Sequence, residues 1–200
     1  LSQLLRGDLE WDQMDIACET MTNCKRFAVL EATNDENWMT CVYPAGAAGQ
    51  QISVEHGLLG EVKNYKRAVR VLDSKTDRRV SPENDAFRFL GHVQRDKPAR
   101  RSSLTIVPFA SAVPTREKTG KQIEEDPKVG WSSALCVPVV LQDDGPVRAI
   151  AVLVSEQDGA FDTKDIDMVD LLMKLAWQRH VSDRTETQRR MEAASRHALM

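Results

Sequence analysis

The residues of this chain that could carry out chemistry are its four cysteines and four histidines. No two cysteines form a Cys-x-x-Cys pair, and the histidines lie far apart without metal-ligand spacing. The eight residues are Cys18, Cys24, Cys41, Cys136, His56, His92, His180 and His197. Each cysteine lies in or beside an apolar stretch, so we expect buried free thiols in a reducing compartment. No metal site is predicted.

Sequence signatures of common enzyme classes are absent. The chain has no Gly-x-Ser-x-Gly, no His-Glu-x-x-His, no phosphate-binding loop and no dinucleotide-binding glycine pattern. Its paired acids, Asp143-Asp144 and Glu124-Glu125, fall in predicted turns and loops, where solvated charge is the ordinary explanation. We therefore predict a protein that is not an enzyme, and the sequence leaves any cofactor unknown.

Composition and charge set the remaining limits. The 200 residues are 42% hydrophobic and carry a net charge of −3, which predicts a soluble globular domain with a sizeable core. Such a charge gives no reason to expect a nucleic-acid or membrane partner, and no run is long enough to span a bilayer. The chain begins at Leu1 rather than Met, so we expect a fragment of a longer, cytoplasmic protein.

The stretch Trp131–Asp170 must organise the elements around it. Two runs, 134–141 and 147–154, are apolar apart from one arginine and are separated by Asp143-Asp144-Gly145. Strands that are apolar on both faces belong in the middle of a covered sheet. Asp and Gly tolerate the backbone angles of tight turns, so the two runs predict a hairpin.

The same stretch resembles the C-terminal half of a GAF domain. The resemblance is carried by Val137-Pro138-Val139, the turn, the second strand and Gly159-x-Phe161-x-x-x-Asp165 opening a helix. A weaker match is Gly57-Leu58-Leu59-Gly60-Glu61-Val62, which is similar to the Gly-x-x-Gly-x-Val segment that opens a helix in that family.

Cyclic-nucleotide-binding members of the family carry Asn, Lys, Phe, Asp and Glu in this region. Phe161 and Asp165 match two of these positions. Ser155 and Glu156 stand where Asn and Lys would be, and Ile166 stands where Glu would be. The resemblance therefore implies the fold without the cyclic-nucleotide signature.

The resemblance implies an α+β fold, an α/β sandwich with a central antiparallel sheet of about six strands. Helices at 8–24 and 163–199 are expected on one face and a candidate pocket on the other. Other predicted elements are strands Phe27–Ala32, Trp38–Tyr43 and Ala68–Asp73, a flexible loop 44–49, and a helix from Val54 or Glu55 to about Lys66. A further helix is predicted to start at Ser81-Pro82-Glu83 and to continue through Asp85–Leu90. Residues 1–181 are predicted to form the GAF-like sensor domain, with a long insertion at about 94–130 and a C-terminal extension at 182–200.

Five positions that match the family's pocket lining are the candidate ligand-binding residues: Tyr43, Asp73, Phe87, Trp131 and Ser133. The aromatic side chains would supply apolar walls, and Ser133 or Asp73 would supply a polar anchor.

Three functions follow from these observations. The first is a regulatory domain that binds a small molecule and transmits the signal through its terminal helices to an output domain in the same parent chain. The second is a degenerate GAF domain that serves as a ligand-free dimerisation scaffold. The third is a reductase, which would require an exposed reactive cysteine. We expect a homodimer through the terminal helices, because Trp11 and Trp177 would otherwise leave apolar surface uncovered.

Overall fold

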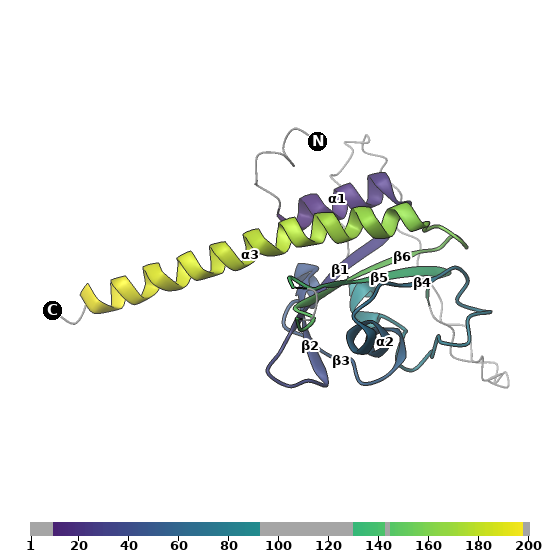
Figure 1. Cartoon of the computed structure of the whole chain (residues 1–200), viewed down its shortest axis with the longest axis horizontal. Coiled ribbons are helices and arrows are strands. Elements are labelled where there is room, and N and C mark those ends of the chain that lie inside the picture. Colours follow the sequence, from purple (N-terminus) through teal and green to yellow (C-terminus); the bar gives the residue numbers. More distant parts are fainter. Residues whose placement is uncertain (1–9, 93–129, 143–144, 198–200) are drawn as a thin grey trace, which may run out of the picture.

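The structure is a computed structural model that describes residues 10–92, 130–142 and 145–197 (Figure 1). The first two residues of the predicted helix 8–24 and the predicted insertion, apart from Gly130, lie outside the described residues, as do the turn residues Asp143 and Asp144. In the part of the chain that is described, no helix is both long enough and apolar enough to cross a membrane.

A six-stranded antiparallel sheet forms the centre of the molecule, in the order β3-β2-β1-β6-β5-β4. The strands are β1 Arg26–Ala32, β2 Trp38–Tyr43, β3 Gln51–Ser53, β4 Val69–Val71, β5 Ser133–Val139 and β6 Ala149–Ser155. Strands β5 and β6 pair as a hairpin inside the sheet, and every residue in them is buried. The predicted fold and the predicted central hairpin are confirmed.

Alternating side chains of the central strands supply two separate cores. Leu135 of β5 and Leu153 of β6 belong to the core that α1 and α3 cover. Their neighbours Cys136 and Val152 belong to the core beneath α2. This alternation follows from the two-residue period of a strand and explains why both runs are apolar throughout.

Helices α1 (Trp11–Met21) and α3 (Thr163–His197) lie side by side on one face, as predicted (Figure 1). Helix α3 begins at Thr163 because two acids satisfy its first turn. Asp162 Oδ1 accepts hydrogen bonds from the N–H groups of Lys164 and Asp165, at 2.7 and 3.0 Å, and Asp165 Oδ2 accepts one from Asp162 N–H at 2.6 Å. The helix then continues well beyond the sheet (Figure 1).

The other face is covered by α2 (Gly57–Tyr65) and by irregular chain, and here three predictions were wrong. Helix α2 starts at Gly57 rather than Val54 or Glu55, because β3 occupies 51–53. The loop 44–49 contains a short 3₁₀ helix, η2 Ala45–Ala47, and β4 is shorter than the predicted strand.

The predicted helix over Asp85–Leu90 is replaced by a turn and a second 3₁₀ helix, η3 Arg88–His92. Two features break the helix. Phe87 has a left-handed backbone conformation, with φ of 43°. The carboxylate of Asp85 is engaged with backbone groups of other segments, as described below.

Candidate functional site

An open cleft of about 600 Å³ lies at the edge of the sheet, between the segment after β4 and the segment before β5. We call it the Trp131 cleft. It is lined by Ser74–Arg78, Val80, Pro82, Gly130–Ser132 and Glu156. Apolar surface from Trp131, Val80 and Pro82 therefore lies beside the polar side chains of a loop, which is the usual composition of a small-molecule site.

Trp131 is fixed in the wall of the cleft by contacts on both sides. Its indole Nε1–H donates to the backbone oxygen of Asp85 at 2.9 Å, and its ring stacks on Phe87 with centroids 5.5 Å apart and an interplanar angle of 17°. Its own carbonyl accepts a hydrogen bond from Ser74 Oγ at 2.8 Å. The indole is thus held in one orientation, with the polar N–H satisfied.

Asp85 joins the segment behind Trp131 to helix α2. Its side chain is fully buried and accepts hydrogen bonds from the N–H groups of Leu58 and Ser81, both at 2.8 Å. The Leu58 N–H is in the first turn of α2, where the helix has no backbone acceptor of its own, so Asp85 caps α2 from a distance in sequence. Burial raises the pKa of the Asp85 carboxyl, and the two hydrogen bonds counter part of that rise.

Gly57 allows Asp85 to approach α2 this closely. Its φ of +72° is a conformation that other residues rarely adopt, and a Cβ placed on it would lie 2.5 Å from Asp85 Oδ1. The first glycine of the Gly-x-x-Gly-x-Val segment is therefore required here, because the backbone has a positive φ and Asp85 leaves no room for a Cβ.

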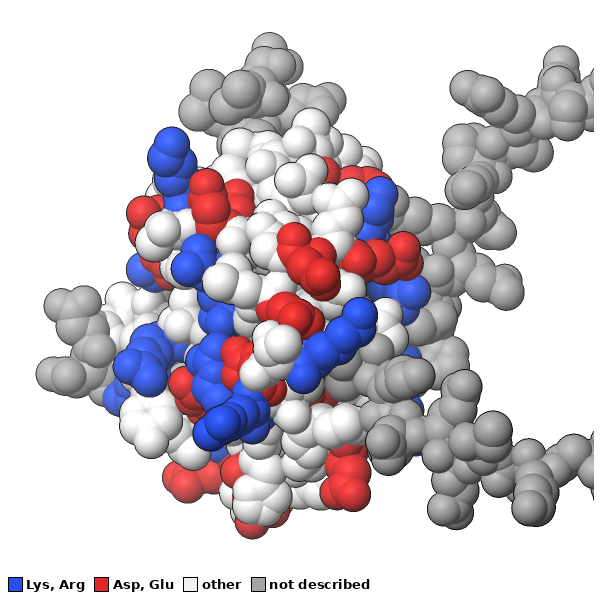
Figure 2. All heavy atoms as spheres, turned by 90° about the vertical axis from the view of Figure 1, so that its right-hand side faces the viewer, with Lys and Arg blue, Asp and Glu red and all other residues white. Residues whose placement is uncertain are grey.

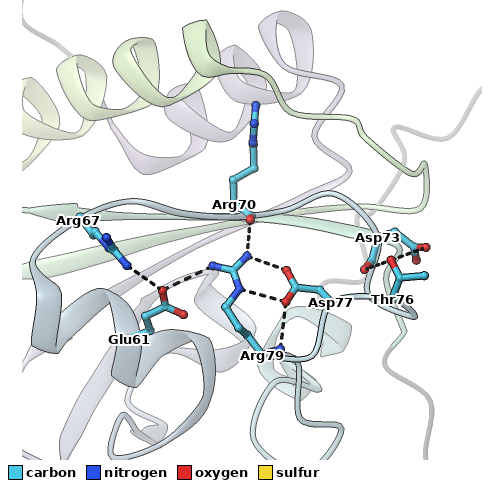
Figure 3. A network of polar contacts seen from close by, with 7 residues as sticks. All are labelled: Glu61, Arg67, Arg70, Asp73, Thr76, Asp77 and Arg79. Carbon is cyan, nitrogen blue, oxygen red and sulfur yellow. Dashed lines mark hydrogen bonds and ion pairs between the residues drawn. The ribbon is translucent and has the colours of Figure 1, made fainter.

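A polar network holds the loop that lines the cleft (Figure 3). Arg79 donates to both carboxylate oxygens of Asp77, at 3.0 and 2.6 Å, and to the backbone oxygen of Arg70 in β4 at 2.9 Å. Glu61 of α2 forms ion pairs with Arg79 and Arg67, both at 3.5 Å. The hydrogen bond from Arg79 lowers the pKa of Asp77. The network ties the loop to β4 and α2 at once.

The charges around the cleft are mixed. Lys75 and Arg78 are exposed on the lining loop, Glu156 lies across from them, and Asp77 is engaged by Arg79. Figure 2 shows basic and acidic side chains interleaved over this side of the molecule, with no broad patch of one sign. The site therefore suits a small polar ligand better than a polyanion.

The structure brings two of the five candidate residues together. Phe87 and Trp131 stack on each other, although only Trp131 lines the cleft. Ser133 lies beneath the cleft, with its hydroxyl donating to the backbone oxygen of Gln157 at 2.6 Å. Asp73 precedes the lining loop, and its carboxylate accepts hydrogen bonds from Lys75 N–H at 2.9 Å and Thr76 Oγ1 at 3.0 Å.

Tyr43 lies away from the other four candidates, on the face covered by α1 and α3. The reason is a β-bulge. Val29 pairs with Tyr43 while the next residue, Leu30, pairs with Cys41, so Val42 is an extra residue in β2. Because a bulge reverses the alternation beyond it, Tyr43 no longer shares a face with Cys41. The expectation that Tyr43 lines a common pocket with Phe87 and Trp131 is corrected here.

Sequence reasoning missed the loop Ser74–Arg78, which supplies much of the lining. A usable signal was present, because a polar run directly follows β4 and precedes Pro82. Polar loops at strand ends are a common place for binding residues.

No protein-family model and no curated protein sequence matches this chain. Solved structures do match it, at low sequence identity and over most of its length. The chain has the fold of a GAF domain.

Three of these structures show the range of proteins that share the fold. The GAF domain of a phosphoenolpyruvate-protein phosphotransferase from Coxiella burnetii is 11% identical, with a TM-score of 0.57 and 94% of each chain covered. The GAF domain of a two-component sensor histidine kinase from Bacillus halodurans is 12% identical, with a TM-score of 0.52, covering 93% of this chain and 97% of the other. A free methionine-R-sulfoxide reductase from Neisseria meningitidis, solved with its substrate, is 12% identical, with a TM-score of 0.53, covering 86% and 77%.

Proposed function

We propose that this chain is a regulatory GAF-type domain that binds a small molecule in the Trp131 cleft and transmits the bound state through its terminal helices to an output domain. The observation that carries the proposal is that α3 has a buried first part and an exposed second part. Val169, Met173 and Trp177 are buried against the sheet, whereas every side chain described after His180 is exposed. A continuous helix that is anchored at one end and exposed at the other is suited to pass a displacement from the domain to its neighbour.

The cleft is connected to the start of α3 through the segment after β6. Glu156 lines the cleft, and the next residue, Gln157, accepts the hydrogen bond from Ser133. Two residues further on, Gly159 N–H donates to the backbone oxygen of Leu72 at 2.7 Å, at the end of β4. A ligand that moved the lining loop would therefore pull on the segment that leads directly into Thr163.

The cleft favours a ligand with a planar or apolar part and an anionic or acceptor group. Trp131 would contact the first part, and Lys75 and Arg78 are placed to bind the second. This chemistry includes nucleotides and aromatic carboxylates, and it does not depend on the cyclic-nucleotide signature that the sequence lacks.

A thermal-shift screen with nucleoside monophosphates, cyclic nucleotides, dicarboxylates and aromatic carboxylates tests the proposal. At about ten times its dissociation constant a ligand adds about 1.4 kcal/mol, which raises the melting temperature of a chain this size by roughly 3–6 °C. Arg78→Ala should abolish the shift, and Arg88→Ala, which removes an exposed arginine outside the cleft, should preserve it. Equal loss in both variants, or no shift with any compound, would count against the proposal.

A second candidate function is the ligand-free dimerisation scaffold, and one observation favours it. The core beneath α2 is filled by the chain's own side chains, among them Leu58, Phe87 and Trp131. On this proposal the domain acts only by forming a dimer, and the Trp131 cleft binds no ligand.

Both candidates include a homodimer through α1 and α3. Trp177 is buried and Trp11 packs on His180, so the two tryptophans are not the uncovered surface that the sequence suggested. The exposed large apolar side chains on the described parts of these helices are instead Ile16, Met21, Leu171, Leu175, Val181 and Met191, which are 44–66% exposed. Leu171→Glu with Leu175→Glu should convert a dimer into a monomer by light scattering. An unchanged mass would contradict this interface.

The third candidate function, a reductase, would need an exposed cysteine thiol that reacts as a nucleophile. All four cysteines are buried and free, and burial raises the pKa of Cys18 to about 12 and that of Cys41 to about 11. Such thiols are poor nucleophiles at neutral pH. We therefore propose a non-enzymatic, cytoplasmic domain. Thiol labelling of the native protein checks it, since a rapidly reacting cysteine would favour the reductase instead.

A further inference from the structure

A second cleft of about 460 Å³ lies on the opposite face, where α3 leaves the sheet. We call it the α1–α3 cleft. The first turn of α1, the end of β2 and the middle of α3 supply most of its lining. Nothing in the proposed sensing site uses it, and its residues have a different character from those of the Trp131 cleft.

Aromatic rings make the walls of the α1–α3 cleft. The ring of His180 lies 5.4 Å, centroid to centroid, from the rings of both Trp11 and Trp177. Tyr43 adds a third aromatic lining residue from β2. The Nε2 atom of His180 is buried and has no hydrogen-bond partner among the described residues. Aromatic faces are negative at their centres and attract cations.

Acidic side chains surround the same space. Glu10, Asp12 and Asp183 line the cleft, and Asp15 accepts a hydrogen bond from the Tyr43 hydroxyl at 2.9 Å. Arg179 is the one basic side chain among the lining residues that are described, and its Nε donates to Asp183 at 2.8 Å. Among the described lining residues, three carboxylates against one guanidinium leave a negative excess.

The hydroxyl of Tyr43 lies beside two of these carboxylates, those of Asp15 and Asp12. A phenol has one proton, and here it is donated to Asp15, so it cannot also be donated to Asp12. Burial is the largest cause that raises the pKa of Tyr43, followed by the hydrogen bond to Asp15 and the charges of Asp15 and Asp12. The hydroxyl therefore stays protonated and donates its hydrogen bond to Asp15.

The cleft does not suit a metal ion, because no group of three or more ligating side chains in the described ranges is placed to hold one. Aromatic walls with carboxylates at the rim instead match a cation that carries apolar substituents. We propose that the α1–α3 cleft binds a small organic cation of the alkylammonium class, with Trp11, Tyr43 and His180 against its methyl or methylene groups and with Glu10 and Asp12 facing its charge.

Calorimetric titration of the whole chain with choline tests this proposal. The matched control ligand is 3,3-dimethylbutan-1-ol, which has the shape of choline without its charge. Choline should bind saturably, and the neutral alcohol should bind at least about tenfold more weakly, because cation–π and carboxylate attraction are absent from it. Equal affinities, or no saturable heat with choline, would overturn the proposal.

Variants of exposed residues locate the site without threatening the fold. Asp12→Asn should weaken choline binding by about fivefold, because one carboxylate beside the cation is lost. Glu36→Gln removes one exposed carboxylate outside the cleft and should leave binding unchanged. Arg78→Ala in the Trp131 cleft should also leave it unchanged, so failure here and failure of the proposed sensing site remain distinguishable. Equal effects of Asp12→Asn and Glu36→Gln would show attraction by overall charge only and would overturn the assignment.

Discussion

The two faces of the sheet bury similar apolar side chains but are covered in different ways. On one face, α1 and α3 satisfy most of their backbone groups within the helix, and the side chain of Asp162 caps the first turn of α3. They pack on the sheet through apolar contacts. On the other face, α2 is short, and the chain from Asp73 to His92 is mostly irregular. Its backbone groups depend on side chains such as Asp85 and Arg79. The proposed sensing site lies on the second face, where a few polar contacts decide the position of a whole loop.

The largest expected effect comes from removing the contact that the irregular face depends on most. Asp85→Ala leaves two N–H groups without their acceptor, those of Leu58 and Ser81, and should lower the free energy of unfolding by about 3 kcal/mol. The control on the helix face is Asp170→Ala, which breaks a partly exposed ion pair with Lys174 and should cost at most about 0.5 kcal/mol. Urea denaturation followed by circular dichroism measures both. Equal costs would remove the distinction between the two faces.

Gly57 and Gly159 both have a positive φ, but only Gly57 is crowded by a neighbouring side chain, so comparing them separates the cost of crowding from the cost of backbone strain. Gly57→Ala should cost about 2 kcal/mol, because its φ of +72° is unfavourable for alanine and the new Cβ would meet Asp85. Gly159→Ala has a similar φ of +65° but no atom within 4 Å of the new Cβ, and should cost about 1 kcal/mol. The same denaturation measurement compares them. A Gly57 variant as stable as the Gly159 variant would mean that Asp85 moves aside easily.

The pH dependence of stability should have opposite signs at Asp77 and Asp85. The folded-state pKa of Asp77 is lowered, so its contribution is present above its unfolded pKa of about 3.9 and is lost as pH falls through the folded value. The folded-state pKa of Asp85 is raised, so the folded protein holds this proton longer and stability falls as pH rises from about 3.9 to the folded value.

Denaturation midpoints of Asp77→Asn and Asp85→Asn between pH 3 and 7, each compared with the wild type, measure the two contributions. On acidification, the stability of the wild type relative to Asp77→Asn should fall. The stability of the wild type relative to Asp85→Asn should rise. Shifts of the same sign in both variants would contradict the assignment of the two carboxyl groups.

The smallest effect is expected at the far end of α3. Arg190 and Glu186 form an exposed ion pair there, so Arg190→Ala should change the free energy of unfolding by less than about 0.5 kcal/mol. A larger loss by urea denaturation would mean that this end of the helix is covered, either by a second copy or by another part of the chain.

Sequence reasoning predicted the regular part of the molecule well. The hairpin of β5 and β6 and the start of α3 follow from continuous apolar runs, turn residues and capping acids, all of which act between near neighbours in the sequence. The same local rules place Trp38–Tyr43 as a strand with its observed bounds.

The site was predicted less well because long-range contacts decide it. The bulge at Val42 moves Tyr43 to the other face, and it depends on how β2 pairs with β1. The helix expected over Asp85–Leu90 fails because Asp85 bonds to Leu58, 27 residues away. Neither partner can be identified from local sequence preference.

The most direct test of the central claim is a crystal structure of the protein purified from cells, examined for bound density in the Trp131 cleft. The account predicts density for a small molecule packed on Trp131 and within reach of Lys75 and Arg78. A cleft closed by the chain's own side chains, in a dimer formed through α1 and α3, would contradict ligand sensing and support the scaffold.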